Sequence, residues 1–181
     1  MERDHIALVR GEEGIQTIAL GSDALAKDSV RGGAEYVKLV ERKARDGSHH
    51  PNGAQRIERV YIAVSDLKAA MEKYNPVLGM KPKIERGTVI MADMAIYQLG
   101  ENGFGLAEPV APGICREALD RRGPGPFQIL FRTGSMDAAA KWMAGHGLPP
   151  PARGIRNTGE QAMLVSPEHA CGVYIGFVGM P

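Results

Sequence analysis

The pattern of apolar and polar residues changes period inside one stretch of the chain, residues 57–80. Residues 57–64 alternate between two faces and are rich in β-branched and aromatic side chains, which predicts a strand. One face of this strand carries Ile57, Arg59, Tyr61 and Ala63. Residues 66–75 then place apolar side chains at helical spacing, and Pro76 and Gly79 are expected to end the helix. The stretch therefore predicts a strand that leads almost directly into an amphipathic helix.

The same order of features recurs in residues 128–148, where a strand pattern, a short polar turn, a helical pattern and a glycine follow one another. An internal repeat is a strong guide to architecture, because each copy is one structural unit that packs against its neighbour. We therefore expect an α+β fold of two tandem β-α-β-β-β units, residues 57–109 and 127–178, joined by a hinge at residues 110–126.

Shorter patterns complete each unit. In the first unit, strands are expected at residues 81–86, 89–99 and 103–108. A short amphipathic helix is expected over residues 111–122, ended by Gly123. The expected elements of the second unit are a helix at residues 135–145 and strands at residues 127–133, 154–157, 160–165 and 173–178.

Residues 1–45 form an N-terminal β/α extension in this interpretation. A strand is expected at residues 14–20, followed by helical segments over residues 23–45 that Gly32 and Gly33 interrupt. Residues 18–23 weakly resemble residues 62–66 of the strand-to-helix stretch, so the extension could also be a shortened third unit. Residues 46–56 read as a linker by composition.

Composition narrows the class of protein. The chain has 181 residues, 44% hydrophobic and 24% charged, with a net charge of +1, so we expect no nucleic-acid or membrane partner. No apolar run approaches the ~20 residues that a transmembrane helix needs, and the N-terminus lacks the apolar core of a signal peptide. The two cysteines do not suggest a disulfide framework. We expect a cytoplasmic protein.

Three motifs, in this order, carry a resemblance to a known family: IERVYIAVSDLKAAMEKYNPVLGM at residues 57–80, GPGPFQILF at residues 123–131 and SPEHACGVYIGFV at residues 166–178. They resemble the vicinal oxygen chelate superfamily, which includes glyoxalase I, extradiol dioxygenases, methylmalonyl-CoA epimerase and bleomycin-resistance proteins. Residues 111–131 are most similar to the epimerase-like branch. The resemblance implies that the two units form a U-shaped mixed sheet around one pocket.

The resemblance also locates the positions that supply metal ligands in many members of the family. These positions fall on Arg59, Gly105, Gln128 and Gly176. Arginine offers no lone pair, glycine has no side chain, and a divalent ion needs several suitable ligands, so we expect neither a metal nor another cofactor. A register slip of one residue would bring in Glu58 and Glu108 instead, but it would turn the faces of the strands over.

The same substitutions suggest a different pocket. Gly105 and Gly176 are expected to open space at its centre, while Arg59 and Gln128 supply polar groups suited to a carboxylate or carbonyl oxygen. Further residues expected to line this substrate-binding site are Tyr61, Leu130, Arg132 and Tyr174. A purely structural role for Arg59, paired with Asp93 or Glu160, is the alternative.

These observations favour a metal-independent protein that binds a small, partly apolar molecule with a carboxylate or carbonyl group. As an enzyme it would isomerise, epimerise or cleave that molecule, with Arg59 and Gln128 as catalytic residues that stabilise an oxyanion. The candidates for the general base are Tyr61, Glu108, Glu160 and His169.

A non-catalytic, sequestering protein of the bleomycin-resistance type is the alternative function, and a metal-dependent glyoxalase or dioxygenase is the least favoured. The edge strands of such units need covering, so a homodimer is expected in either case.

Overall fold

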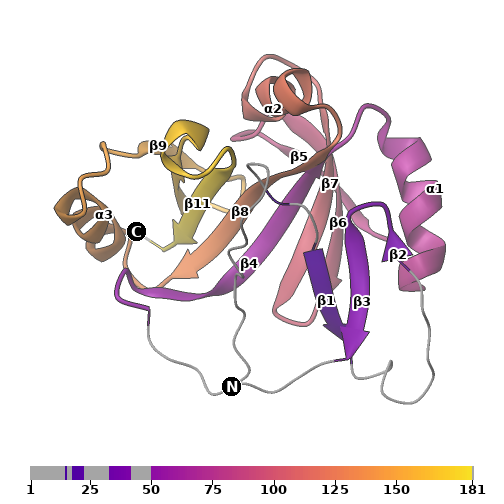
Figure 1. Ribbon diagram of the computed structural model, residues 1–181, viewed down its shortest axis with the longest axis horizontal. Coiled ribbons are helices and arrows are strands. Elements are labelled where there is room, and N and C mark those ends of the chain that lie inside the picture. Colours follow the sequence, from indigo (N-terminus) through magenta and orange to yellow (C-terminus); the bar gives the residue numbers. More distant parts are fainter. Residues whose placement is uncertain (1–14, 16–17, 23–32, 42–49, 181) are drawn as a thin grey trace.

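The fold is built around one eight-stranded mixed sheet in the order β5-β6-β7-β4-β8-β11-β10-β9 (Figure 1). This computed structural model describes residues 15, 18–22, 33–41 and 50–180. The strands of the sheet are β4 (Ala54–Ala63), β5 (Lys83–Gly87), β6 (Ala92–Leu99), β7 (Asn102–Pro109), β8 (Gly125–Thr133), β9 (Ala152–Ile155), β10 (Gln161–Val165) and β11 (Tyr174–Gly179). The order is symmetric about the β4–β8 pair, which confirms the two tandem units.

The β4–β8 pairing joins the units. The two strands are antiparallel, with Arg59 opposite Leu130 and Tyr61 opposite Gln128. Each then pairs in parallel with the last strand of its own unit, so that Tyr61 lies opposite Gly105 and Gln128 opposite Tyr174. The equivalent positions of the two repeats therefore meet at the centre of the sheet.

The described part of the chain contains three α-helices. In α1 (Leu67–Leu78), the Asp66 side chain caps the start by accepting a hydrogen bond from the Ala69 N–H at 2.9 Å. In α3 (Met136–Gly145), Ser135 caps Ala138 in the same way. The third helix, α2 (Ile114–Arg122), lies between the two units.

The predicted end of α1 was wrong. Pro76 lies inside the helix, which continues to Leu78 and ends at Gly79 with a φ of 62°. A proline in the last turn removes one backbone hydrogen bond without breaking the helix, whereas a left-handed C-cap does end it.

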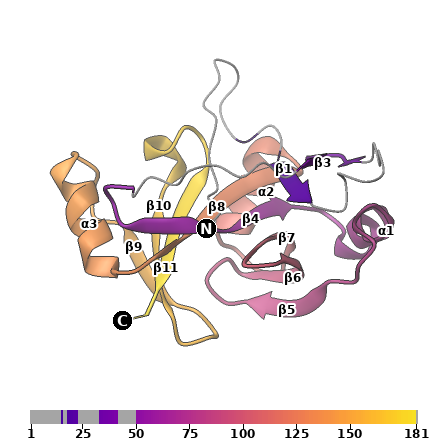
Figure 2. The ribbon, with the colours of Figure 1, turned by 90° about the horizontal axis from the view of Figure 1, so that it is seen from below.

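The two faces of the sheet are covered differently. On the outer face, α1 packs against the first unit with Tyr74 beside Phe104, while α3 packs against the second unit with Met143 in a cluster with Phe177 (Figures 1 and 2). The concave face, which carries Tyr61 and Gln128, gathers apolar side chains from both units and from α2 into one core cluster. Any site shared by the units therefore lies on the concave face.

A break in the strand alternation changes the predicted faces of β4. The β4–β8 register shifts between Ile57 and Arg59, which marks a bulge or irregularity at Glu58. Ile57 was predicted to share a face with Arg59, but it packs against the outer-face cluster instead, so this part of the prediction was wrong. Glu58 contacts Arg132 instead of alternating away from it.

The N-terminal segment forms a small separate sheet of β1 (Ile18–Ser22), β3 (Val37–Glu41) and β2 (Gly33–Ala34). The predicted helix is therefore wrong over residues 33–41; its other parts, residues 23–32 and 42–45, lie outside the described residues. Val37 is buried against the α1 cluster, and the Tyr36 hydroxyl donates to the Pro124 carbonyl at 2.7 Å. The described part of the extension thus docks on the first unit of its own chain.

The two edge strands of the sheet come back together. Asn157, in the β9–β10 turn, donates from Nδ2 to the Arg86 carbonyl on β5 at 2.6 Å and accepts from the Thr88 hydroxyl at 2.7 Å. In a flat sheet, β5 and β9 would lie about 30 Å apart, because strands are spaced about 4.8 Å. The sheet is therefore strongly curled (Figure 2). We call the contacts of Asn157 with Arg86 and Thr88, which join the two edges of the sheet, the latch.

No helix within the described ranges is long and apolar enough to cross a membrane.

The latch generates a prediction about stability. Asn157→Ala is expected to lower the free energy of unfolding by about 1 kcal/mol, the usual net worth of such hydrogen bonds. Amide hydrogen exchange in β5 and β9 should become faster, while exchange in β4 and β8 should not. Thr88→Val provides the matched partner for a double-mutant cycle measured by urea denaturation. Strictly additive effects of the two substitutions would show that the latch contributes no coupling.

Candidate functional site

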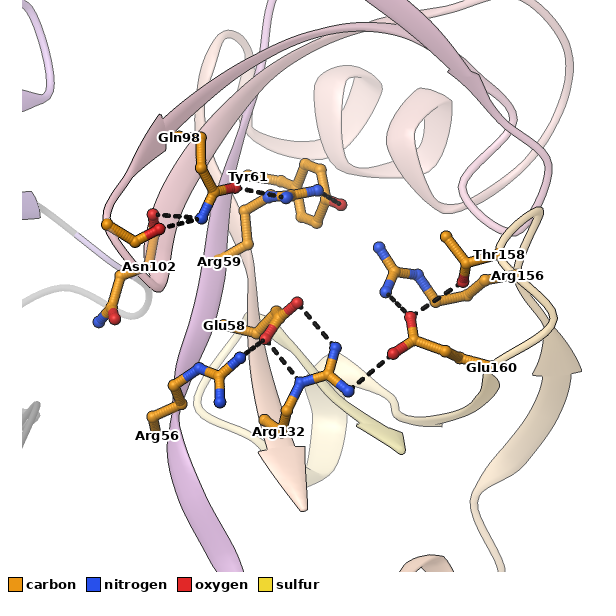
Figure 3. A network of polar contacts seen from close by, with 11 residues as sticks. Arg56, Glu58, Arg59, Tyr61, Gln98, Asn102, Arg132, Arg156, Thr158 and Glu160 are labelled. Carbon is orange, nitrogen blue, oxygen red and sulfur yellow. Dashed lines mark hydrogen bonds and ion pairs between the residues drawn. The ribbon is translucent and has the colours of Figure 1, made fainter. Parts of the chain in front are cut away.

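Arg59 is a buried cation whose hydrogen-bonding capacity is largely unused. The residue is 9% exposed, on β4. Its Nη2 donates to Gln98 Oε1 at 3.3 Å, and its Nη1 donates to the Tyr61 hydroxyl at 3.4 Å (Figure 3). Its Nε has no hydrogen-bond partner, and Glu85 Oε1 lies 4.0 Å from Nη1. These are long contacts to mostly neutral groups, so the positive charge is poorly compensated.

The predicted structural bridges to Arg59 do not form. Asp93 pairs with Arg86 through two bonds of 2.7 and 2.8 Å, and Glu160 pairs with Arg132 and Arg156. The residues that do meet Arg59, Gln98 on β6 and Glu85 on β5, were missed by sequence reasoning. Because β6 and β7 separate β5 from β4, the Arg59–Glu85 contact exists only through the curl of the sheet. The local sequence pattern does not encode this curl.

Gln98 is held in place by the turn that follows it. Its Nε2 donates to the carbonyls of Gly100 and Asn102 at 2.7 and 3.0 Å. Its oxygen is therefore aimed at Arg59, and all parts of this amide are used (Figure 3).

Gln128 stands in contrast. Its side chain is 3% exposed on the concave face, its Oε1 has no hydrogen-bond partner, and no hydrogen bond joins its side chain to another described residue. A Cβ at Gly176 would lie 3.1 Å from its Nε2, so the amide extends towards that glycine. A buried amide without partners costs free energy unless a ligand or water satisfies it.

The expectation that Gly105 and Gly176 leave open space was wrong. A Cβ at Gly105 would lie 2.8 Å from the Tyr61 ring and 2.9 Å from Ile96 Cδ1, and one at Gly176 would lie 2.6 Å from Leu130 Cδ1. Larger neighbouring side chains occupy both places, because the interior of a fold is closely packed. These glycines thus permit close packing beneath the polar groups.

Arg132, another residue expected to line the site, is fully engaged. Its guanidinium donates to both oxygens of Glu58 at 2.8 and 2.9 Å and contacts Glu160 Oε1 at 2.7 Å, while Glu58 and Glu160 also accept from Arg56 and Arg156 (Figure 3). Burial raises the pKa of the Glu58 and Glu160 carboxyls, but the hydrogen bonds and charges of these arginines outweigh it and leave both pKa values below the ordinary range. We call this set, Arg56, Glu58, Arg132, Arg156 and Glu160, the ion network.

The remaining predicted lining residues, Tyr61, Leu130 and Tyr174, meet in the concave-face cluster. The Tyr61 hydroxyl accepts from Arg59 and so keeps its own proton for another acceptor. The Tyr174 hydroxyl instead donates to Glu117 Oε2 on α2 at 2.7 Å, and burial together with that carboxylate raises its pKa.

The proposed general bases are spread over the molecule. Glu108 accepts from the Leu67 N–H at the start of α1, Glu160 belongs to the ion network, and His169 is exposed in the short 3₁₀ helix η2 (Pro167–His169). Tyr61 alone among the four makes a contact with Arg59.

The residues at the four predicted ligand positions do not fit a divalent metal. Only Gln128 carries a donor atom there, and the two glycine positions are filled by Tyr61, Ile96 and Leu130. Among the described residues, no group of three or more His, Cys, Asp or Glu side chains is placed to hold a metal ion.

Comparisons with solved structures place this fold among known ones. Methylmalonyl-CoA epimerase from Mycobacterium tuberculosis matches with a TM-score of 0.63 and 24% identity, over 71% of this chain and 90% of that chain. A Streptomyces coelicolor methylmalonyl-CoA epimerase variant, in complex with 2-nitronate-propionyl-CoA, matches with a TM-score of 0.61 and 24% identity over 70% and 95%. A hypothetical protein from Bacillus halodurans gives 0.56 and 21% over 68% and 92%. These likenesses show the fold.

No curated protein sequence matches this chain significantly. A family model, however, matches residues 58–165, which span most of both β-α-β-β-β units. Together with the symmetric curled sheet, this match confirms the family that the sequence motifs indicated: the chain belongs to the glyoxalase/bleomycin resistance protein/dioxygenase superfamily.

Proposed function

We propose that this protein binds a small, partly apolar molecule through a carboxylate or carbonyl oxygen on the concave face of the sheet, without a metal ion. The observation that carries the proposal is the state of Arg59, a cation that is nine-tenths buried with one unpartnered nitrogen and no close carboxylate. An anionic or strongly polar oxygen placed there would restore the missing compensation. Tyr61 and Leu130, beside Arg59, make its surroundings on this face apolar.

The contrast between Arg59 and Arg132 supports this assignment. Both lie on the central strand pair, yet Arg132 has two carboxylates within 3 Å and Arg59 has none. A bidentate fork that is already occupied has little left to offer a ligand. Arg132 therefore acts as a structural residue of the ion network, and Arg59 acts as the anion anchor.

Catalysis by the same site would use the groups that the fold brings to Arg59. Arg59 and the Tyr61 hydroxyl would stabilise a developing enolate oxygen, as isomerisation or epimerisation next to a carbonyl requires. Glu85, whose carboxylate lies 4.0 Å from Arg59 and is partly exposed, is the group at hand to accept a proton. The methylmalonyl-CoA epimerases of the same fold make this reaction class the first to test.

A sequestering protein is the second candidate. It needs only a complementary apolar surface with a few polar groups. One observation favours it: Lys83 Nζ lies 3.0 Å from Glu85 Oε2. Glu85 is therefore already ion-paired and is a weaker candidate for a general base beside Arg59.

We further infer a homodimer in the cytoplasm. The edge strands β5 and β9 expose Ile84 and Ile155 at 57% and 70%, and a second copy would cover such edges. Cys115 and Cys171 are free thiols, which suits a reducing compartment.

One prediction from the proposed function concerns Arg59, the anion anchor. In a thermal-shift screen of small carboxylates and acyl-CoA compounds, a ligand that stabilises the wild type should bind Arg59→Met about 30-fold more weakly, because a charged hydrogen bond contributes about 2 kcal/mol. Without ligand, Arg59→Met should melt at the same or a higher temperature, since it removes a poorly paired buried charge. The matched control is Arg86→Met, which removes an exposed arginine on β5. Equal stabilisation of the wild type and Arg59→Met would rule out Arg59 as the anchor.

The second prediction concerns the ion network and pH. Because the folded-state pKa values of Glu58 and Glu160 are lowered, their contribution to stability is complete above the ordinary value of 4.5 and is lost as pH falls through the lowered values. Arg132→Gln should lower the free energy of unfolding at pH 7 by on the order of 3 kcal/mol and flatten its decline below about pH 4.5. Urea denaturation between pH 3 and 7 measures both. An unchanged pH profile in Arg132→Gln would contradict the assignment.

The third prediction concerns metals. Tag-free protein should contain no stoichiometric Zn, Ni, Co, Fe or Mn by elemental analysis. In titration calorimetry with Ni²⁺ and Co²⁺, the wild type and Gln128→Leu should give the same result, because no metal site includes Gln128. A metal content near one per chain would overturn the metal-free part of the proposal.

A further inference from the structure

Gln98 and Gln128 on the concave side of the fold differ in their hydrogen bonding in a way that points to a ligand group. Gln98 uses its oxygen and its nitrogen in three hydrogen bonds. Gln98 is also exposed, whereas Gln128 is only 3% exposed and makes no side-chain hydrogen bond to any described residue. Turning the amide over would exchange its oxygen and nitrogen without creating a partner for both. The Gln128 amide is therefore an unused donor and acceptor pair.

The position of this amide relative to the anchor is fixed by strand register. Arg59 on β4 lies opposite Leu130 on β8, and Leu130 lies opposite Gly176 on β11. The Gln128 amide extends to the Gly176 position, where a Cβ would be 3.1 Å from its Nε2. Because neighbouring strands are about 4.8 Å apart, the β4 and β11 positions in this row lie about 10 Å apart. Leu130, an apolar residue, lies between them.

We propose that Gln128 recognises an amide group of the ligand, and that the ligand is an amide-bearing carboxylate whose acid end lies on Arg59 and whose middle is an apolar chain over Leu130. A primary amide presents the complementary donor and acceptor side by side, which a simple carboxylate or ester does not. This inference rests on the proposed function of Arg59. It adds a second recognition point and a preferred ligand length.

The test uses two series of matched compounds, the monoamides and the monomethyl esters of linear dicarboxylic acids from succinic to suberic acid. Each pair keeps the carboxylate, the chain length and the carbonyl oxygen, while the ester carries OCH3 in place of NH2 and so lacks the N–H donors. Dissociation constants are measured by titration calorimetry for the wild type, Gln128→Leu and Arg59→Met. We expect the wild type to bind the best-fitting monoamide about tenfold more tightly than its ester, which is the effect of about one hydrogen bond.

Gln128→Leu should bind the amide and the ester equally, whereas Arg59→Met should lose both. Gln128→Met serves as a second variant if the leucine disturbs folding, judged by the melting temperature. Equal binding of amide and ester by the wild type would overturn the role of Gln128 and leave the anchor intact. Binding of neither series would overturn the amide-bearing carboxylate as the ligand class, and the acyl-CoA arm of the Arg59 screen then decides whether the anchor stands.

Discussion

The antiparallel pairing of β4 with β8 determines where every other part of the site lies. Its register sets Arg59 opposite Leu130 and Tyr61 opposite Gln128, so the equivalent strands of the two repeats meet along one seam. In each unit the last strand, β7 or β11, pairs in parallel with β4 or β8. Both units have their concave face on the side opposite to α1 and α3. The edges then return to one another at Asn157, and a concave face is the consequence.

One irregularity in that pairing decides how charge is distributed on this face. Where the register shifts at Glu58, the carboxylate comes to Arg132 and completes its fork. The next residue, Arg59, points to the same side of the sheet but meets amide and hydroxyl oxygens instead. A strictly alternating strand would have turned Glu58 to the outer face and left Arg132 without this partner. The bulge therefore separates an arginine with two close carboxylates from one whose nearest carboxylate is 4.0 Å away.

The sequence supported the architecture better than the details of the site. The two units were predictable because strand and helix periods repeat in order, and Gly79 ends α1 as expected although Pro76 does not. The strand at residues 37–41 was mistaken for a helix because its pairing with β1 is a tertiary contact that local pattern does not contain. Glu85 and Gln98 were missed for a similar reason, since they reach Arg59 only after the sheet curls. The occupied space at Gly105 and Gly176 depends on side-chain packing from neighbouring strands.

Arg59 and Gln128 break the rule that buried polar groups are satisfied. Among the described residues, Arg56 Nε and the Tyr74 hydroxyl also lack a partner. The neighbouring Gln98 is fully bonded, the ion network pairs its carboxylates, and Tyr174 has found Glu117. Each unsatisfied group costs on the order of 1–3 kcal/mol, a large part of the stability of a domain. The costs at Arg59 and Gln128 fall on the same concave face, on the two strands where the repeats meet. Departures of this kind are expected where a protein keeps polar groups ready for something that it binds.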